Sequence, residues 1–510
     1  MKNVDLVVIG GGPAGLCATI SAASSGSNVL LIERSKKLGG QLVKQTHMFF
    51  GSEKQYASIR GIDISNILLK EIEKYKDKIE IMEDTTVLGI YEDGIITAEN
   101  KGKYIKIRPK AVVVATGASE KASAFPNNDL PGIYGAGAVQ TLMNVYGVLP
   151  GKRALMVGAG NIGLIIAYQL MQAGVDVAAV IHHSPRIGGY HVHASKIQRM
   201  GVPILTNHAI KEAKGKDNVE SVVIHELDRD KNPIPGSEKK LDVDTICVSV
   251  GLSPLTELLA QAGCELEYVK ELSGLVPVID DRYETSVKGI FVAGDTAGVE
   301  EASMAMVEGY LSGLYAAESL GYRHPDFDKL AEDYRSQLAA LRRVMSGEKK
   351  RMDLPDAEKF RNKFPSLDRI NEGPVAIIEC FQEIPCNPCT IACNRHAIAM
   401  MEDINDLPQL DIEKCNGCAL CVSKCPGLAI MVVDGSYSDD EALFKIPYEF
   451  TPLPKDGDIV KGLDRFGNYL TDVKIVKVQN LKSFDRTPLI HAAVNKDYIY
   501  EFRNIRMGDI

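Results

Sequence analysis

The feature that most constrains the fold is a glycine-rich turn between an apolar strand and a helix of small residues. Residues 4–9 have the pattern of a strand, the helix extends through Ser24, and the turn between them contains Gly10, Gly12 and Gly15. The next expected strand ends at Glu33. In such a unit a pyrophosphate approaches the glycine backbone at the helix N-terminus, and the carboxylate accepts hydrogen bonds from ribose hydroxyls. The pattern predicts a dinucleotide site.

The same unit occurs again in the middle of the chain. Residues 153–157 have the pattern of a strand and residues 164–173 that of a helix, and the turn between them contains Gly158, Gly160, Asn161, Ile162 and Gly163. The following strand, residues 175–181, leads to His182 and His183, with no carboxylate where an NAD ribose is usually held. The two histidines are equally consistent with solvated loop residues. We expect a nucleotide site that distinguishes NADH from NADPH only weakly.

Composition and charge limit the classes of protein to consider. The chain has 510 residues, 45% of them apolar, with 67 acidic against 58 basic side chains, which suits three or four globular domains. Its net charge of −9 favours neither nucleic acid nor anionic membranes as partners. The uncharged stretch 154–175 suits strand, turn and helix better than a membrane span. Asp5 interrupts a would-be signal core, so we expect a cytoplasmic protein.

Eight of the eleven cysteines lie between residues 380 and 425, which indicates metal binding in a chain without a signal peptide. Four of them have the C-x2-C-x2-C-x3-C-P spacing of bacterial ferredoxins: Cys415, Cys418, Cys421 and Cys425. A zinc knuckle would use two separated C-x2-C pairs instead. The remaining three, Cys17, Cys247 and Cys264, are expected to be buried packing residues.

An internal repeat predicts a second cluster. A shift of 32 residues maps three of these cysteines onto Cys386, Cys389 and Cys393. Because the fourth cysteine of each motif ligates the other cluster, the expected ligands of cluster II are Cys415, Cys418, Cys421 and Cys393, and those of cluster I are Cys386, Cys389, Cys425 and one more. Cys380 is favoured as that ligand because thiolate is soft, while Glu383, the counterpart of Cys415, and a three-iron cluster are the alternatives.

Together, the two glycine fingerprints, the Ala115-Thr116-Gly117 strand end and the Gly294-Asp295 strand end resemble the two-dinucleotide-binding-domain flavoproteins over residues 1–320. The resemblance implies FAD in a discontinuous first domain and an NAD(P)-type site in an inserted second domain. The implied FAD-binding residues are Gly10, Gly12, Pro13, Ala14, Gly15, Glu33, Arg34, Gly40, Gln41, Val87, Ala115, Thr116, Gly117, Gly294 and Asp295. Those of the second site are Gly158, Gly160, Asn161, Ile162, Gly163, His182, His183 and Gly251.

The run from Phe125 to Gln140 resembles the α subunits of heteromeric sarcosine oxidase, dye-linked proline dehydrogenase and hydrogen-cyanide synthase. That resemblance implies an oxidase-like flavoprotein partner that oxidises an amine or amino acid. Thioredoxin reductase chemistry is not expected, since residues 130–270 contain no Cys-x-x-Cys pair. The ferredoxin spacing differs from the four-cysteine module expected of those α subunits, so their function need not transfer whole.

The expected architecture is α/β, with two Rossmann-like domains, a small ferredoxin-like domain and a β-rich tail. The boundaries are 1–129 and 271–321 for the FAD-binding domain, 130–270 for the inserted NAD(P)-type domain, 322–375 for a helical connector, 376–432 for the ferredoxin-like domain and 433–510 for the C-terminal domain. The basic run at residues 349–351 is expected to be a solvated face.

A flavin accepts two electrons together, whereas an iron–sulfur cluster carries one. We therefore expect an oxidoreductase with FAD and two [4Fe–4S] clusters, acting as the electron-transferring subunit of an amine or amino-acid dehydrogenase complex. NAD(P)H or another adenine nucleotide would occupy the second site, and a ferredoxin is a possible electron acceptor. The alternatives are a self-sufficient NAD(P)H:ferredoxin-type oxidoreductase and a non-catalytic electron-relay subunit.

Overall fold

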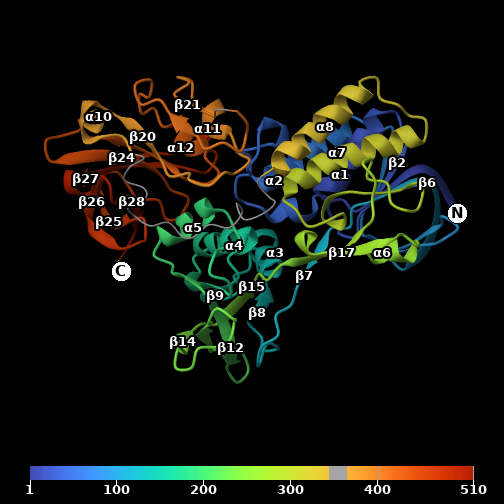
Figure 1. Cartoon of the computed structure of the whole chain (residues 1–510), viewed down its shortest axis with the longest axis horizontal. Coiled ribbons are helices and arrows are strands. Elements are labelled where there is room, and N and C mark those ends of the chain that lie inside the picture. Colours follow the sequence, from blue (N-terminus) through green and yellow to red (C-terminus); the bar gives the residue numbers. More distant parts are fainter. Residues whose placement is uncertain (344–363, 401, 509–510) are drawn as a thin grey trace. The chain divides into compact units, whose positions relative to one another are not determined.

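A computed structural model describes residues 1–343, 364–400 and 402–508. Two compact units are present (Figure 1). The first contains residues 1–49, 54–121 and 251–343, and the second contains residues 50–53, 122–250 and the described part of the chain beyond 343. The basic run at 349–351 lies outside the described residues. Within the described ranges, no helix is both long enough and apolar enough to cross a bilayer.

The first unit is built on a seven-stranded sheet in the order β3-β2-β1-β6-β5-β4, with β19 also paired to β6. Its strands are β1 (Lys2–Ile9), β2 (Val29–Ile32), β3 (Ile79–Met82), β4 (Thr85–Ile90), β5 (Ile96–Asn100), β6 (Lys103–Val114) and β19 (Ile290–Val292). The apolar run 6–9 pairs in parallel with 29–32 and with 111–114, all buried. Such doubly covered parallel strands read as continuous apolar runs. The unit also contains two antiparallel two-stranded sheets. One is formed by β7 (Ala118–Glu120) and β16 (Leu252–Pro254), and the other by β17 (Leu266–Val269) and β18 (Gly274–Pro277).

Helix α1 (Pro13–Ser24) is held against α7 (Ala302–Ser319) by unusually close backbones. A Cβ added at Gly309 would lie 2.1 Å from the carbonyl oxygen of Ala14, and one at Gly313 would lie 2.2 Å from that of Ala18. Glycine is therefore required on α7, and its backbone supports the first turn of α1. The other helices of this unit are α2 (Gly61–Glu73), α6 (Glu257–Gln261) and α8 (Phe327–Arg342).

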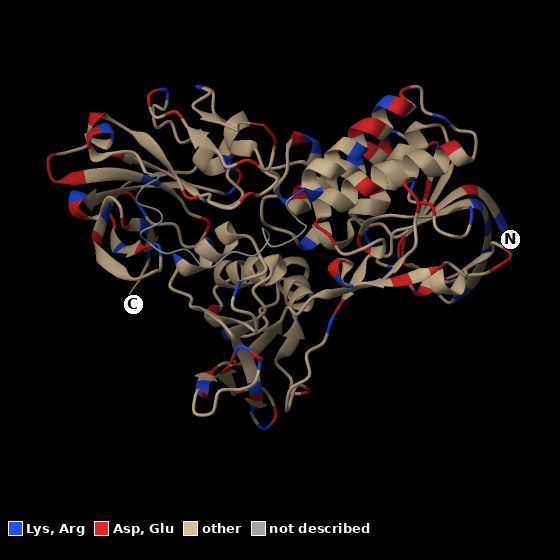
Figure 2. Ribbon diagram, in the orientation of Figure 1, with Lys and Arg blue, Asp and Glu red and all other residues tan. Residues whose placement is uncertain are grey.

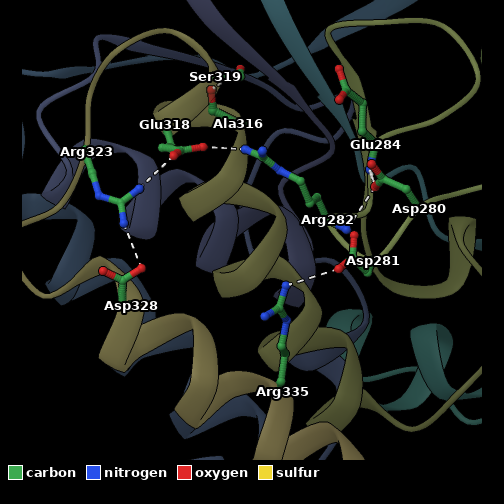
Figure 3. Close-up of polar contacts among 10 residues, drawn as sticks. All are labelled: Asp280, Asp281, Arg282, Glu284, Ala316, Glu318, Ser319, Arg323, Asp328 and Arg335. Atoms are coloured by element: carbon green, nitrogen blue, oxygen red, sulfur yellow. Dashed lines mark hydrogen bonds and ion pairs between the residues drawn. The ribbon is translucent and has the colours of Figure 1, made fainter.

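Helix α8 lies in the sequence expected to be a connector, but it belongs to the first unit. Ion pairs link α8 and the end of α7 to the loop before β19 (Figure 3), where Arg335 lies 3.5 Å from Asp281 and Arg282 pairs with Glu318. Helix α8 carries both acidic and basic residues, whereas α7 carries acidic residues and no basic one (Figure 2). Exposed pairs of this kind contribute about 0–1 kcal/mol each. A less exposed group also joins the two helices, because Arg342 of α8 pairs with Glu300 at 2.7 Å and with the buried Glu308 of α7.

The nucleotide-type part of the second unit has a five-stranded parallel sheet in the order β11-β10-β9-β15-β8. Its strands are β8 (Ile133–Gly135), β9 (Arg153–Val157), β10 (Asp176–His182), β11 (Ile204–Thr206) and β15 (Thr245–Val248), and its helices are α3 (Ala136–Tyr146), α4 (Asn161–Gln172) and α5 (His191–Gln198). An antiparallel sheet is attached, formed by β12 (His208–Lys214), β13 (Ser221–Glu226) and β14 (Lys239–Asp242). The expected strand–turn–helix unit is confirmed, with α4 beginning at Asn161 rather than at residue 164.

The C-terminal part is a seven-stranded sheet in the order β20-β23-β24-β27-β26-β25-β28. Its strands are β20 (Val375–Ile378), β23 (Ile430–Asp434), β24 (Glu441–Pro447), β25 (Ile459–Asp464), β26 (Tyr469–Gln479), β27 (Leu489–Asn495) and β28 (Phe502–Arg506). The boundary expected after residue 432 thus falls inside β23, and the ferredoxin-like and C-terminal segments share one sheet. The cysteine-bearing loops between β20 and β23 contain α11 (Pro388–Ile391), α12 (Leu420–Lys424), β21 (Ile398–Ala399) and β22 (Gln409–Leu410), and α10 (Leu367–Glu372) precedes β20.

A candidate flavin site and two cysteine cavities

The turn between β1 and α1 has the backbone geometry of a phosphate site. Gly10 has φ of +109°, and a Cβ added there would lie 2.2 Å from the carbonyl oxygen of Ala115. A Cβ added at Gly15 would lie 1.8 Å from the Gly10 oxygen, whereas one at Gly12 would meet nothing closer than 3.9 Å. No side chain caps the helix at Gly12. The first and third glycines are thus needed for packing, while the second leaves space for a pyrophosphate.

Glu33 is held in place by the backbone around it. Gly11 N–H donates to Oε2 and Ser35 N–H donates to Oε1, both at 2.7 Å, and the residue is buried. Each carboxylate oxygen keeps a further lone pair that can accept from a ribose hydroxyl. Arg34, the neighbouring expected residue, is exposed.

Strands β6 and β19 are neighbours in the sheet, and the residues that follow them form hydrogen bonds with each other. Gly117 N–H donates to Oγ1 of Thr296 at 2.8 Å, and Oγ1 of Thr116 donates to the Leu255 carbonyl at 2.9 Å. Burial raises the pKa of Asp295 to about 6, and its carboxylate accepts from Glu300 N–H over a long 3.4 Å. A buried carboxyl group with so weak a partner suits a ligand that brings hydroxyl groups.

The remaining candidates for FAD binding also lie in the first unit. Gly39 N–H donates to the Gly11 oxygen at 2.8 Å, and a Cβ added at Gly40 would lie 2.6 Å from Gly12 Cα. Gln41 follows and is exposed. Pro13 and Ala14 begin α1, Ala115 follows β6, Gly294 precedes Asp295, and Val87 lies half-buried on β4. The structure brings the glycine turn, Glu33 and the two strand ends into one site.

The second glycine turn, between β9 and α4, repeats this geometry. Gly158 has φ of +108°, and a Cβ added there would lie 2.0 Å from the Ser249 oxygen. A Cβ added at Gly163 would lie 2.0 Å from the Gly158 oxygen, whereas one at Gly160 meets nothing within 4 Å. No side chain caps α4. This turn also leaves its helix N-terminus open to a phosphate group.

His182 takes the place that Glu33 has in the first site. Ala159 N–H donates to Nδ1 of His182 at 3.3 Å, as Gly11 N–H donates to Glu33. Because Nδ1 accepts, Nε2 of the neutral imidazole carries the proton and can donate to a nucleotide oxygen. His183 is exposed, with its ring centroid 4.9 Å from that of His182. Glu33 would accept a hydrogen bond from a ribose hydroxyl, whereas His182 would donate one to the nucleotide. The two sites therefore differ in the direction of the hydrogen bond to the ligand.

The likeness of the two glycine turns extends to the segment that follows the second strand of each unit, which the sequence analysis did not predict. Residues 33–41, E-R-S-K-K-L-G-G-Q, align with residues 182–190, H-H-S-P-R-I-G-G-Y. The N–H groups of Gly188 and Gly189 donate to the Ala159 oxygen at 3.1 and 2.9 Å, and Asn161 Oδ1 accepts from Tyr190 N–H at 2.6 Å. Ile162 is exposed. Gly251 belongs to the first unit, where its carbonyl accepts from Lys121 N–H at 3.0 Å.

The eight clustered cysteines line two separate cavities. One cavity is lined by Cys393, Cys415, Cys418 and Cys421, and the other by Cys380, Cys386, Cys389 and Cys425. These are the two sets that ligand exchange between the halves of the repeat predicts, with Cys380 as the eighth member. Glu383 does not line the second cavity, although its neighbours Gln382 and Ile384 do.

Backbone N–H groups donate to a sulfur in each cavity. Among the described residues, no three His, Cys, Asp or Glu side chains are placed to hold one metal ion. Ala397 N–H donates to Cys393 Sγ at 3.2 Å, and its repeat counterpart Ala429 N–H donates to Cys425 Sγ at 3.4 Å. Burial raises the pKa of Cys380 to about 12, so only metal binding would deprotonate it near neutral pH.

Comparisons with known proteins identify the family. Residues 4–309, more than half of the chain, match the family described as pyridine nucleotide-disulphide oxidoreductase. The chain belongs to that family. Residues 408–431 match a 4Fe-4S binding domain. The protein is therefore a flavin-dependent oxidoreductase that binds FAD and carries an iron–sulfur cluster, and the two-Rossmann fold expected from the sequence is confirmed.

Similar proteins cover only part of this oxidoreductase. An opine oxidase subunit of Agrobacterium tumefaciens (strain Ach5) is 26% identical over 62% of this chain and 66% of its own length. The alpha subunit of sarcosine oxidase from Rhizobium meliloti (strain 1021) is 26% identical over 63% of this chain and 31% of its own. The crystal structure of L-proline dehydrogenase from P. horikoshii is 25% identical with a TM-score of 0.51, covering 66% of this chain and 59% of that one. The chain spans less than two thirds of each, and the expected resemblance is confirmed.

Residues far apart in the oxidoreductase sequence enclose the second cysteine cavity. Phe50 and Val192 both line it, and a Cβ added at Gly427 would lie 2.9 Å from Val192 Cβ. Gly51, beside Phe50, accepts a hydrogen bond from Asn387 N–H at 3.1 Å. Nothing local in the sequence predicts these contacts, because they join the segment 50–53, helix α5 and the cysteine loops only through tertiary packing.

Proposed function

We propose that this chain is the electron-transferring subunit of an amine or amino-acid dehydrogenase complex, with FAD and two [4Fe–4S] clusters. The observation that carries the proposal is the pair of four-cysteine cavities on the same chain as the glycine turn, Glu33 and Asp295 of the candidate FAD site. Bound FAD supplies two-electron chemistry, whereas each cluster carries one electron. Such a chain can accept two electrons together at the flavin and pass them on one at a time through the clusters.

The described residues account for cofactor binding as follows. The open N-terminus of α1 would hold the pyrophosphate, Glu33 would accept from the ribose of the adenosine, and Asp295 would accept from hydroxyls of the ribityl chain. Cys393, Cys415, Cys418 and Cys421 would hold cluster II, and Cys380, Cys386, Cys389 and Cys425 would hold cluster I. The second glycine turn would hold NAD(P)H or another adenine nucleotide.

Substrate oxidation is assigned to a partner, an oxidase-like flavoprotein subunit. Oxidation of an amine to an imine releases two electrons and two protons, and the electrons would leave this chain one at a time to a one-electron acceptor of the ferredoxin class. Support comes from relatives whose names describe them as subunits of opine and sarcosine oxidases. The cytoplasmic location expected from the sequence stays a prediction.

A second candidate function is a self-sufficient NAD(P)H:ferredoxin-type oxidoreductase. It is favoured by the second glycine turn, because Gly160 and the uncapped N-terminus of α4 keep the geometry that binds phosphate in the first site. In that case the hydride would come from NAD(P)H rather than from a partner subunit. A relay subunit whose second turn holds a purely structural nucleotide is the remaining alternative.

Expressed alone, the chain is expected to show NAD(P)H-dependent dye reduction at most, and no dehydrogenase activity with proline, sarcosine or other amino acids. The reason is that the FAD and nucleotide folds, the cysteine loops and the C-terminal sheet account for the described residues. Anaerobic flavin bleaching with a panel of amino acids measures this. Co-expression with an oxidase-like subunit encoded beside it is the matched positive control. Turnover by the homogeneous, isolated chain would contradict the assignment.

The direction of the hydrogen bond that His182 would form with a bound nucleotide gives a prediction for the choice between NADH and NADPH. The wild type is expected to prefer NADH or NADPH by less than ~100-fold, about 2.7 kcal/mol. The substitution His182→Glu would supply a carboxylate that accepts from ribose hydroxyls and repels a 2′-phosphate, so the preference is expected to move toward NADH by about tenfold.

Stopped-flow reduction of the flavin by each nucleotide is the measurement. His183→Glu is the matched control, since the same charge change at an exposed neighbour is expected to alter the ratio by less than about threefold. A wild-type preference above ~100-fold, or equal shifts in both variants, would contradict the prediction. No reduction by either nucleotide would favour the relay alternative.

A further inference from the structure

The surroundings of the second cysteine cavity contain an unusual concentration of buried charge. Glu379, directly before Cys380, is buried and accepts hydrogen bonds from Arg503 Nε at 2.5 Å and from Arg465 Nη2 at 2.8 Å. Burial acts to raise the pKa of Glu379, but Arg503, Arg465 and Arg199 together lower it to about 2. One carboxylate is therefore shared by two guanidinium groups, of which that of Arg503 is fully buried.

Arg199 adds a third guanidinium, itself buried, with no carboxylate of its own. It follows α5 directly, is 5% exposed, and donates from Nη2 to the Leu428 oxygen at 3.0 Å and from Nε to the Ser195 oxygen at 3.1 Å. In the described ranges of the chain, no acidic side chain lies within ion-pair distance of Arg199. A buried cation bonded only to neutral carbonyls is unfavourable unless a negative group lies nearby.

Glu379 is a negative group that acts on Arg199, but it is already paired with Arg503 and Arg465, and a bound cluster would be a second negative group beside the Cys425 loop. Leu428, which receives the Arg199 hydrogen bond, donates its own N–H to the Cys425 oxygen at 3.0 Å, and the next residue donates to Cys425 Sγ. Through the Leu428 carbonyl, Arg199 is therefore bonded to the loop whose backbone donates to this sulfur. Lys196 is one turn earlier on α5 and is also buried.

The basic side chains near the first cysteine cavity are less buried than Arg199. Arg369 donates to the carbonyls of Ile412, Gly373 and Cys415, and Lys445 Nζ donates to the Gly417 oxygen, but both side chains are only part-buried. Arg395, which lines this cavity, is exposed, and Cys418 is exposed as well. Water screens a charge at such a position much more strongly than one in the protein interior. The two cavities thus differ in the electrostatic surroundings that the same cluster type would meet.

We propose that Arg199, assisted by Lys196, is the built-in counter-charge of cluster I and selectively raises its reduction potential. The inference rests on the proposed two-cluster arrangement. Each reduction adds one negative charge to the cluster, which burial in an apolar cavity disfavours and a buried guanidinium favours. The second nucleotide fold would in this way contribute, through α5, a residue that sets the redox behaviour of the iron–sulfur module.

The test is a potentiometric titration of the full-length holoprotein, poised with dithionite and read by electron paramagnetic resonance. The cluster I signal is identified as the one lost in Cys380→Ser. Arg199→Gln is expected to lower the equilibrium constant for reduction of cluster I at least tenfold, ~59 mV for one electron, with cluster II unchanged. Lys196→Met is expected to shift it less, in the same direction, and Arg199→Lys is expected to stay within about threefold of wild type.

Arg395→Gln is the matched control, because it removes the same charge from an exposed residue that lines the first cavity. An unshifted cluster I potential in Arg199→Gln protein of full iron content overturns the proposal, as does an equal shift of both clusters. If Arg199→Gln does not assemble its clusters, an unshifted potential in Lys196→Met overturns it instead. Wild-type protein with only about four irons would overturn the two-cluster arrangement as well, and that failure appears before any variant is made.

Discussion

Replacing Cys380 by serine is expected to remove cluster I and lower the iron content from about eight to about four atoms per chain. The physical reason is that Cys380 completes the second cavity with Cys386, Cys389 and Cys425. A cube with only three thiolates loses its fourth corner, and serine is a harder ligand that binds iron of this kind less well. Anaerobic iron and acid-labile sulfide analysis, with electron paramagnetic resonance, measures the loss.

Two variants control for this result. Glu383→Gln tests the alternative ligand and is expected to retain full iron, since Glu383 does not line the cavity. Cys264→Ser removes a buried thiol of the first unit, outside both cavities, and is also expected to retain full iron. A three-iron signal in wild-type protein prepared without oxidant, or iron loss in Glu383→Gln, would count against Cys380 as the fourth ligand.

Replacing Gly12 by valine is expected to weaken FAD binding by more than ~100-fold, at least about 2.7 kcal/mol, while the apoprotein still folds. Gly12 has φ of −79° and ψ of −174°, a conformation open to any residue, and an added Cβ would meet only Gly40 Cα at 3.9 Å. The side chain would instead fill the space that a pyrophosphate needs. FAD content and affinity are measured together with thermal unfolding of the apoprotein.

The duplicated turn supplies the matched control. Gly160 has nearly the same backbone conformation, φ −80° and ψ 174°, and similar open space. Gly160→Val is therefore expected to leave FAD binding unchanged and to weaken nucleotide binding at the second turn. Stoichiometric FAD in purified Gly12→Val protein would show that the pyrophosphate does not approach this glycine.

Local sequence patterns predicted the parts of the fold whose cause is local. Helix α1 and strand β9 end where the sequence analysis placed their ends, because apolar runs, small residues and glycines change sharply there. For strand β6 the sequence analysis identified only the end of the strand, beside Ala115, whereas the strand begins at Lys103. Its first half pairs with β5 and alternates exposed charged residues with buried ones, a polar pattern that does not stand out as a strand without its partner.

The same distinction applies to the sites. Spacing and the repeat grouped seven of the eight cysteines into the sets that line the cavities, and the softness of thiolate added Cys380. The surroundings of the second cavity could not be predicted in this way. Phe50, Val192 and Arg199 reach the cavity or its cysteine loop from segments separated by more than a hundred residues from the cysteines, and no local pattern marks them.

The shared C-terminal sheet limits how this protein can be divided in the laboratory or by proteolysis. Strand β23 hydrogen-bonds to β20 on one side and to β24 on the other. A fragment that stops after β23 would lose β24, one of the two partners of β23. A fragment that starts after β23 would expose the backbone edge of β24. Unpaired edges of this length recruit other chains. Attempts to isolate a minimal electron carrier should therefore not cut the chain between β20 and β28, since shorter pieces would leave strand edges unpaired and would be expected to aggregate.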